Sequence, residues 1–99
     1  MSLLHTVNKS PFAAPTLDAC LAHMAEGAAL ILIEDGVYAA LADGPHAGKL
    51  AGRLRVYALR ADLAARGLSE RALIAGIGLI DYEGFVDLCV AASAVQSWL

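Results

Sequence analysis

The sequence predicts an α/β fold: a three-layer sandwich in which helices cover a mainly parallel sheet of four to five strands. Short apolar runs alternate along the chain with segments whose apolar residues recur at helical spacing. The connections between these segments have lengths that suit right-handed crossovers between parallel strands. No Pro-, Gly- or Ser-rich linker interrupts the pattern, so we expect one domain over residues 1–99.

The first half of the chain is predicted to hold two strands and two helical segments. Leu3–Val7 is a short apolar run that stops at a polar loop, as a strand does. Thr16 can cap the helix that follows, and Gly27 lies in the usual position past a helix end. The apolar stripe of this helix consists of Leu17, Cys20, Leu21 and Met24. Leu30–Ile33 is uniformly apolar, as expected of a strand covered on both faces, and Val37–Leu41 follows as one or two helical turns.

The second half repeats this rhythm. Leu54–Leu59 alternates as a strand does, and Ala61–Arg66 is a short helix that Gly67 closes. Ile77–Ile80 is the next strand, and the chain from Tyr82 onward is helical. The residues on one face of this last helix are Phe85, Leu88, Cys89 and Ala92. The predicted order is therefore a strand followed by a helix, four times over.

The chain is rich in apolar residues, which make up 59% of it, with a mean hydropathy of +0.61. Its longest apolar runs, Ala28–Ile33 and Val37–Ala42, fall far short of the roughly 20 residues that cross a membrane. Alanine accounts for 21 of the apolar residues, and a sandwiched sheet could absorb most of the others. Because a domain of this size leaves much apolar surface outside, the composition favours contacts with partner subunits.

Charge and cysteine content exclude some classes of function. The formal net charge is −3, and the only dense group of cations is Arg53, Arg55 and Arg60, so the chain lacks the basic surface that binds nucleic acid. Two cysteines far apart in the sequence are too few for a disulfide framework. We therefore expect a reduced, cytoplasmic setting with no direct contact to nucleic acid or membrane.

The sequence contains no motif for a cofactor or a metal ion. Neither G-x-G-x-x-G after a strand nor a P-loop pattern is present, and His5, His23 and His46 share no metal-ligand spacing. Glu34 and Asp35 follow a predicted strand at the carboxyl edge of the sheet, where open α/β folds bind ligands. A phospho-receiver site would also need a Lys beyond a later strand, and both lysines lie early. We expect Glu34 and Asp35 to form a solvated turn or to cap the next helix.

Cys20 is the candidate for a reactive group. It lies about one turn into its helix, where the positive end of the helix dipole favours a thiolate, and His23 follows it at i+3. The same residue belongs to the apolar stripe of the helix, so packing in the core is the competing interpretation. Cys89 lies among apolar residues of the last helix and is expected to pack against the sheet.

Several blocks of the sequence resemble the DsrH/TusB family of sulfur-relay subunits, and they occur in the family's order along nearly the whole chain. The blocks are His5–Phe12, Leu32–Val37, Val56–Leu59, Asp62–Leu68, Ile80–Val86 and Val95–Trp98. The resemblance implies a DsrE-like domain that forms the smallest subunit of a cytoplasmic heterohexamer, built from two copies each of three related chains.

The resemblance also implies a function. Complexes of this family pass sulfur, as a cysteine persulfide, to a small acceptor protein of the DsrC/TusE kind, and the main persulfide cysteine is expected on another subunit. One branch of the family supplies 2-thiouridine at the tRNA wobble position, and the other serves intracellular sulfur oxidation. A cysteine where Cys20 stands is typical of the second branch.

The sequence therefore favours a sulfur-oxidation subunit in which Cys20 is a secondary persulfide acceptor and His23 supports its thiolate. The alternatives are a subunit for tRNA thiolation and a purely structural chain that completes the hexamer.

Overall fold

A five-stranded parallel sheet forms the middle layer of the protein in a computed structural model that describes residues 3–53 and 55–99. The strands are β1 (Leu3–Val7), β2 (Ala29–Leu32), β3 (Val56–Leu59), β4 (Gly78–Ile80) and β5 (Ala94–Trp98). Their order across the sheet is β4-β3-β2-β1-β5, and each neighbouring pair is parallel. The α/β class and the parallel sheet predicted from the sequence are confirmed.

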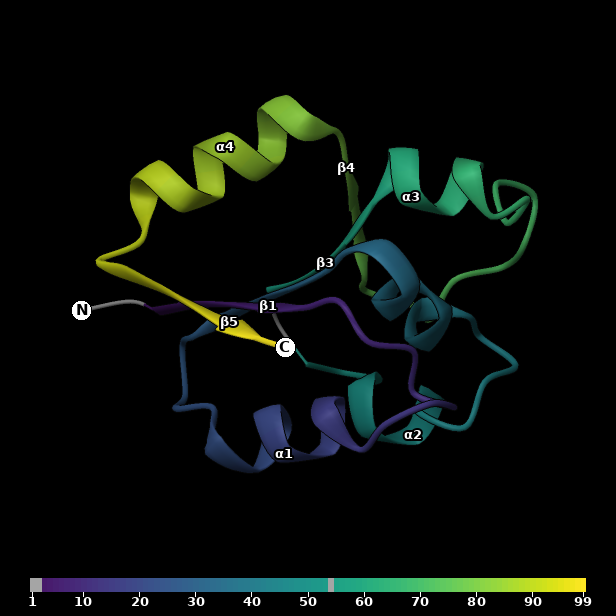
Figure 1. Cartoon of the computed structure of the whole chain (residues 1–99), viewed down its shortest axis with the longest axis horizontal. Coiled ribbons are helices and arrows are strands. Elements are labelled where there is room, and N and C mark those ends of the chain that lie inside the picture. The colour runs from purple at the N-terminus through teal and green to yellow at the C-terminus, as the bar shows by residue number, and fades with distance from the viewer. Residues whose placement is uncertain (1–2, 54) are drawn as a thin grey trace.

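Helices lie on both sides of this sheet (Figure 1). They are α1 (Thr16–His23), the 3-10 helix η1 (Glu34–Ala40), α2 (Ala47–Leu50), α3 (Arg60–Ala65) and α4 (Tyr82–Ala91). Figure 1 shows α4 along one face of the sheet and α1 with α2 along the other. No helix among the described residues is long and apolar enough to span a membrane.

The two faces of the sheet are covered unequally. Alternate residues of β1 point to opposite faces, so Val7 joins a large core with α1, whereas Leu4 joins a small core beneath α4. The buried members of the small core are Leu4, Ala29 and Ile31, and α4 itself has no buried residue. The α4 layer is therefore thin and leaves apolar side chains in contact with solvent.

The structure differs from the sequence prediction at several element ends. The last helix stops at Ala91, and the chain returns as β5, which the periodicity did not predict. Thr16 is the first helical residue, and Pro15 occupies the cap position without a side-chain hydrogen bond, so the predicted Thr16 cap is wrong. The predicted start of the third strand at Leu54 lies outside the described residues, and β3 begins at Val56.

Candidate functional site

Cys20 lies in the large core, where α1 packs on the sheet. Its relative exposure is 0%, and Leu17, one turn earlier, is also buried. Burial raises the pKa of the Cys20 thiol to about 11, while the positive charge of Arg53 acts in the opposite direction. The thiol is therefore protonated at neutral pH and closed to solvent in this conformation, because desolvation outweighs the nearby cation.

His23 lies on the exposed last turn of α1 and contacts an aromatic ring. Its imidazole meets the ring of Trp98 edge to face, with 5.7 Å between ring centroids. Trp98 in turn donates its indole Nε1–H to Nδ1 of His5 over 3.0 Å. His23 thus belongs to a cluster with Trp98 and His5, and the charge that acts on the Cys20 thiol is that of Arg53.

His5 is the buried member of this cluster. Its relative exposure is 2%, and its Nε2 has no hydrogen-bond partner. Burial, and then the charge of His23, lower the pKa of His5 below its usual value. The neutral imidazole suits this place, because Nδ1 must keep a lone pair to accept the indole proton.

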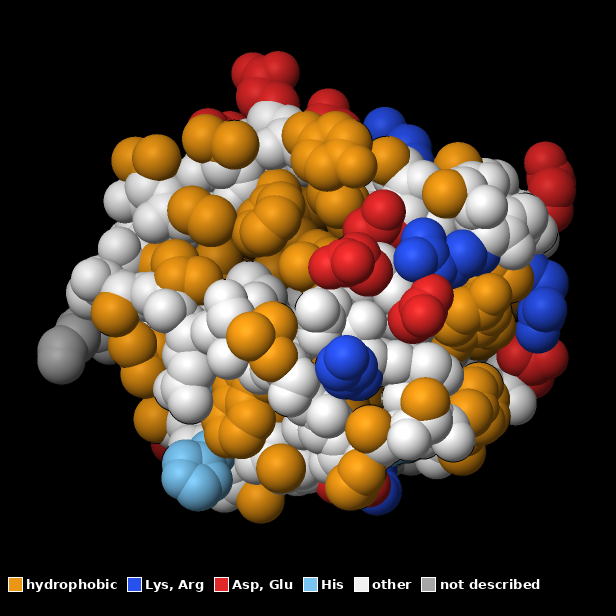
Figure 2. Space-filling view, in the orientation of Figure 1, with side chains coloured by type: hydrophobic (Ala, Val, Ile, Leu, Met, Phe, Trp, Pro, Cys, Tyr) orange, Lys and Arg blue, Asp and Glu red, His pale blue; other side chains and the backbone are white. Residues whose placement is uncertain are grey.

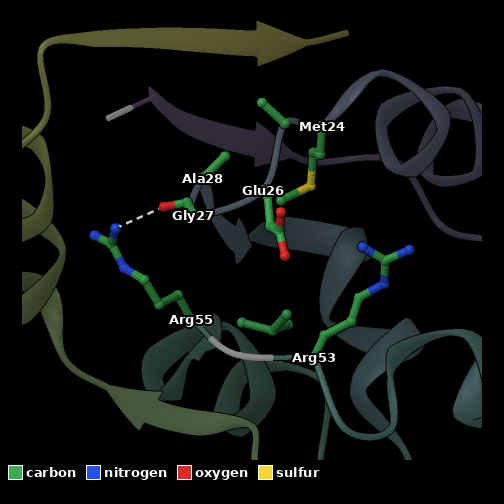
Figure 3. Close-up of a pocket in the computed structure, with 8 residues that line it drawn as sticks. Met24, Glu26, Gly27, Ala28, Arg53 and Arg55 are labelled. Carbon is green, nitrogen blue, oxygen red and sulfur yellow. Dashed lines mark hydrogen bonds between the residues drawn. The ribbon is translucent and has the colours of Figure 1, made fainter. Parts of the chain in front are cut away.

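A cavity of about 310 Å³ opens where α1 ends, near the starts of β2 and β3 (Figure 3). Its walls are Met24, Ala25, Glu26, Gly27, Ala28, Arg53, Arg55 and Val56. Arg55 donates to the Gly27 carbonyl oxygen over 2.8 Å, and Arg53 donates to the Lys49 carbonyl oxygen over 2.9 Å. In Figure 3 the Glu26 side chain lies between the two arginines. Two arginines of the dense group in the sequence, Arg53 and Arg55, line this cavity, which the sequence did not predict.

The acidic residues at the other end of the strands make contacts that join η1 to α3. Glu34, which has a positive φ of 50°, donates its N–H to Asp62 Oδ2 over 2.6 Å. Arg66 donates from Nε to Asp35 Oδ1 over 2.8 Å and from a terminal nitrogen to the Asp62 carbonyl oxygen over 3.1 Å. Glu34 and Asp35 are exposed, as predicted, but they are the first two residues of η1, whose cap position is held by Ile33, so they form neither a separate turn nor a cap. These contacts connect η1 to α3 and give the edge a structural role.

Comparison with known proteins identifies the family. The family model described as DsrH like protein matches residues 9–95. The chain belongs to the DsrH family. Protein TusB of Pectobacterium parmentieri is 42% identical over 97 residues, which cover 97% of this chain and 100% of that protein. Protein TusB of Escherichia coli O81 (strain ED1a) is 39% identical over the same shares of both chains. The resemblance recognised from the sequence is thereby confirmed.

Solved structures show the same fold at low sequence identity. The ychN protein of E. coli matches with a TM-score of 0.77 and 17% identity over 98% of each chain. MTH1491 of Methanobacterium thermoautotrophicum, a protein of unknown function, matches with a TM-score of 0.66 and 16% identity over 96% of each chain. Both likenesses concern the fold alone, which the DsrH-family chain shares with them across nearly its whole length.

Proposed function

We propose that this DsrH-family chain is a non-catalytic subunit of a cytoplasmic sulfur-relay complex. It completes an assembly with two related sister chains, in the two-copies-of-three arrangement that the sequence resemblance implies. The complex hands persulfide sulfur to a small acceptor protein of the DsrC/TusE kind. The observation that carries the non-catalytic role is the full burial of Cys20, whose pKa of about 11 leaves almost no thiolate at neutral pH.

The pathway we propose is 2-thiouridine synthesis at the tRNA wobble position. Full-length relatives at 39–42% identity carry the name Protein TusB. The sequence argument for sulfur oxidation depended on a reactive Cys20. A thiol enclosed in the core has a packing role, and this role explains the presence of Cys20 without any sulfur transfer. The net charge of −3 fits a subunit that meets other proteins and leaves the tRNA to a later carrier.

A second candidate function is supported by the position of Arg53. Its charge opposes the burial that raises the pKa of Cys20, so an outward movement of α1 would remove the desolvation and leave the cation to favour a thiolate. The Cys20 thiolate would attack the outer sulfur of a partner's persulfide, the S–S bond would break, and the partner's cysteine would leave as a thiolate. His23 would support this thiolate only after turning from Trp98. This second candidate function corresponds to the sulfur-oxidation branch of the family.

Sulfur loading of the intact complex tests the first candidate. The chain is coexpressed with its two sister chains, loaded by a cysteine desulfurase and cysteine, and mapped for persulfides by mass spectrometry. We expect sulfur on a sister chain and on the acceptor, and unchanged transfer in Cys20→Ala, with Cys89→Ala as the matched control. A persulfide on Cys20 together with lost transfer in Cys20→Ala would establish the second candidate. Failure of the wild-type chain to assemble with its sisters would refute both.

The pathway is tested in cells. Deletion of the gene is expected to remove 2-thiouridine from hydrolysed tRNA, as measured by chromatography with mass spectrometry, and Cys20→Ala is expected to restore it. Normal 2-thiouridine with impaired oxidation of reduced sulfur compounds would assign the chain to sulfur oxidation.

A further inference from the structure

Helix α4 presents apolar side chains on two sides. Phe85 and Leu88 pack against the small core of the sheet. Tyr82, Val86 and Val90 follow one another at intervals of four residues, so they form one row along the helix, and they are 61%, 58% and 80% exposed. A helix that only covered its own sheet would carry polar residues along this row. The row therefore indicates a second contact of α4 beyond the sheet.

The edge strand β5 extends this apolar row. Val95 pairs with Leu4 in the parallel register, so the two side chains are on the same face of the sheet, and Leu4 belongs to the small core beneath α4. Val95 is 45% exposed. Figure 2 shows hydrophobic side chains gathered along α4 and in the space between α4 and the sheet. We call Tyr82, Val86, Val90 and Val95 the α4–β5 surface.

The charges on α4 itself, and on the residue that caps it, all have one sign. Asp81, Glu83 and Asp87 are exposed, and the sequence has no Lys or Arg after Arg71. None of the ion pairs among residues 3–53 and 55–99 involves these three carboxylates, although Asp81 accepts a hydrogen bond from the Gly84 N–H. Two copies meeting through this surface would bring six carboxylates together without a cation from α4 or β5. The charge pattern therefore disfavours a second copy as the occupant.

We infer that the α4–β5 surface docks a sister chain whose contact face is apolar at its centre and bordered by Lys or Arg. The apolar row supplies the desolvated centre of the contact, and Glu83 with Asp87 supplies the charged rim that orients the partner. The identity of the partner as a sister chain rests on the proposed function, whereas its chemistry follows from the exposed residues and charges of α4 and β5.

Assembly of the coexpressed complex tests the inference. Val86→Asp with Val90→Asp places charge in the apolar row at two exposed positions. We expect the affinity for the two sister chains, measured by dilution and native mass spectrometry, to fall by about tenfold or more. Ala64→Asp with Ala65→Asp, at exposed positions on α3, is the matched control and should assemble as the wild type does. Circular dichroism confirms folding, and Val86→Ser with Val90→Ser replaces the Asp pair if α4 unfolds.

A charge-reversed variant tests the rim separately. Glu83→Lys with Asp87→Lys should weaken assembly at low salt, and the loss should shrink as salt is added, because rim charges act through screened electrostatics. If both the Asp and the Lys variants assemble as the wild type does, the inference is overturned and the proposed function stays intact. Self-association of the wild-type chain that Val86→Asp with Val90→Asp abolishes would overturn it in favour of a second copy. Failure of the wild type to bind its sisters would overturn the proposed function and this inference with it.

Discussion

Trp98, at the end of β5, donates its indole N–H to Nδ1 of His5 on β1 over 3.0 Å, a contact between residues 93 apart in the sequence. His5 is buried in the middle of β1, and β5 pairs with β1 at the edge of the sheet. The residues of β5 that precede Trp98 are exposed to solvent. This side-chain hydrogen bond is therefore a specific anchor for an edge strand that has little core of its own.

Replacing Trp98 with Phe should destabilise the protein. The variant keeps an aromatic ring but leaves His5 Nδ1 buried without its donor, which costs about 1–3 kcal/mol of the free energy of unfolding. The measurement is urea unfolding monitored by circular dichroism, because the change removes the sole tryptophan and with it the tryptophan fluorescence signal. In a His5→Leu background the same change should cost much less, and equal costs in both backgrounds would show that the hydrogen bond contributes nothing.

The stability of the fold should fall in mild acid because of His5. Its pKa in the folded protein is lowered, first by burial and then by the charge of His23, whereas in the unfolded chain it stays near 6.5. The unfolded state then binds the proton more readily. The contribution of His5 is fully present above about pH 6.5 and is lost as the pH falls from there toward the folded pKa.

Proton NMR titration of the imidazole signals measures this effect directly. We expect the His5 resonance to titrate below 6.5, and His23→Ala to raise that pKa by removing a like charge. Urea unfolding at several pH values should show a weaker acid dependence in His5→Gln than in the wild type. A wild-type His5 that titrates at or above 6.5 would contradict the assignment of a desolvated imidazole.

The two cysteines should react with thiol reagents at very different rates. Cys20 is fully buried, and its pKa of about 11 leaves roughly a thousandth of the thiol ionised near pH 8, about a hundredfold less than for an ordinary thiol. Cys89 is half-buried on α4. With each cysteine alone, in Cys89→Ala and Cys20→Ala, an aromatic disulfide reagent should label Cys20 far more slowly. Similar rates in the folded protein would mean that α1 opens readily.

The layered α/β arrangement could be predicted from the sequence because its evidence is local. Leu30–Ile33 is a continuous apolar run and Leu3–Val7 is a mostly apolar one, and their parallel pairing follows from the helix between them. The strand β5 could not be predicted in this way. Its residues are mostly exposed, so they show no apolar alternation, and its place is set by pairing with β1 at the far end of the chain.

The environment of the candidate site was harder to predict for the same reason. The apolar stripe of α1 showed which face carries Cys20, but the depth of burial depends on the sheet and on α1 together. The helix-dipole argument predicted a lowered pKa for the thiol, whereas desolvation raises it. His23 is three residues from Cys20, but its ring contacts Trp98, which only the pairing of β5 with β1 brings near.

Gly36 should tolerate no side chain. It is buried in η1, and an added Cβ would overlap the carbonyl oxygen of Val7, which already accepts the Ile33 N–H over 3.0 Å. Because the obstacle is backbone at the end of a central strand, Gly36→Ala should lower the free energy of unfolding by about 1–3 kcal/mol or more.

Gly48 supplies the matched control for this change. A Cβ there meets nothing within 4 Å, and the residue is exposed within α2, so Gly48→Ala should stabilise the protein by up to about 1 kcal/mol through helix propensity. For a domain near 100 residues, each kcal/mol corresponds to a shift in Tm of about 4–8 °C. Thermal unfolding should therefore show a lower Tm for Gly36→Ala and a higher Tm for Gly48→Ala than for the wild type. A Gly36→Ala protein as stable as the wild type would show that β1 and η1 can separate at no cost, contrary to the close packing that holds η1 against the end of β1.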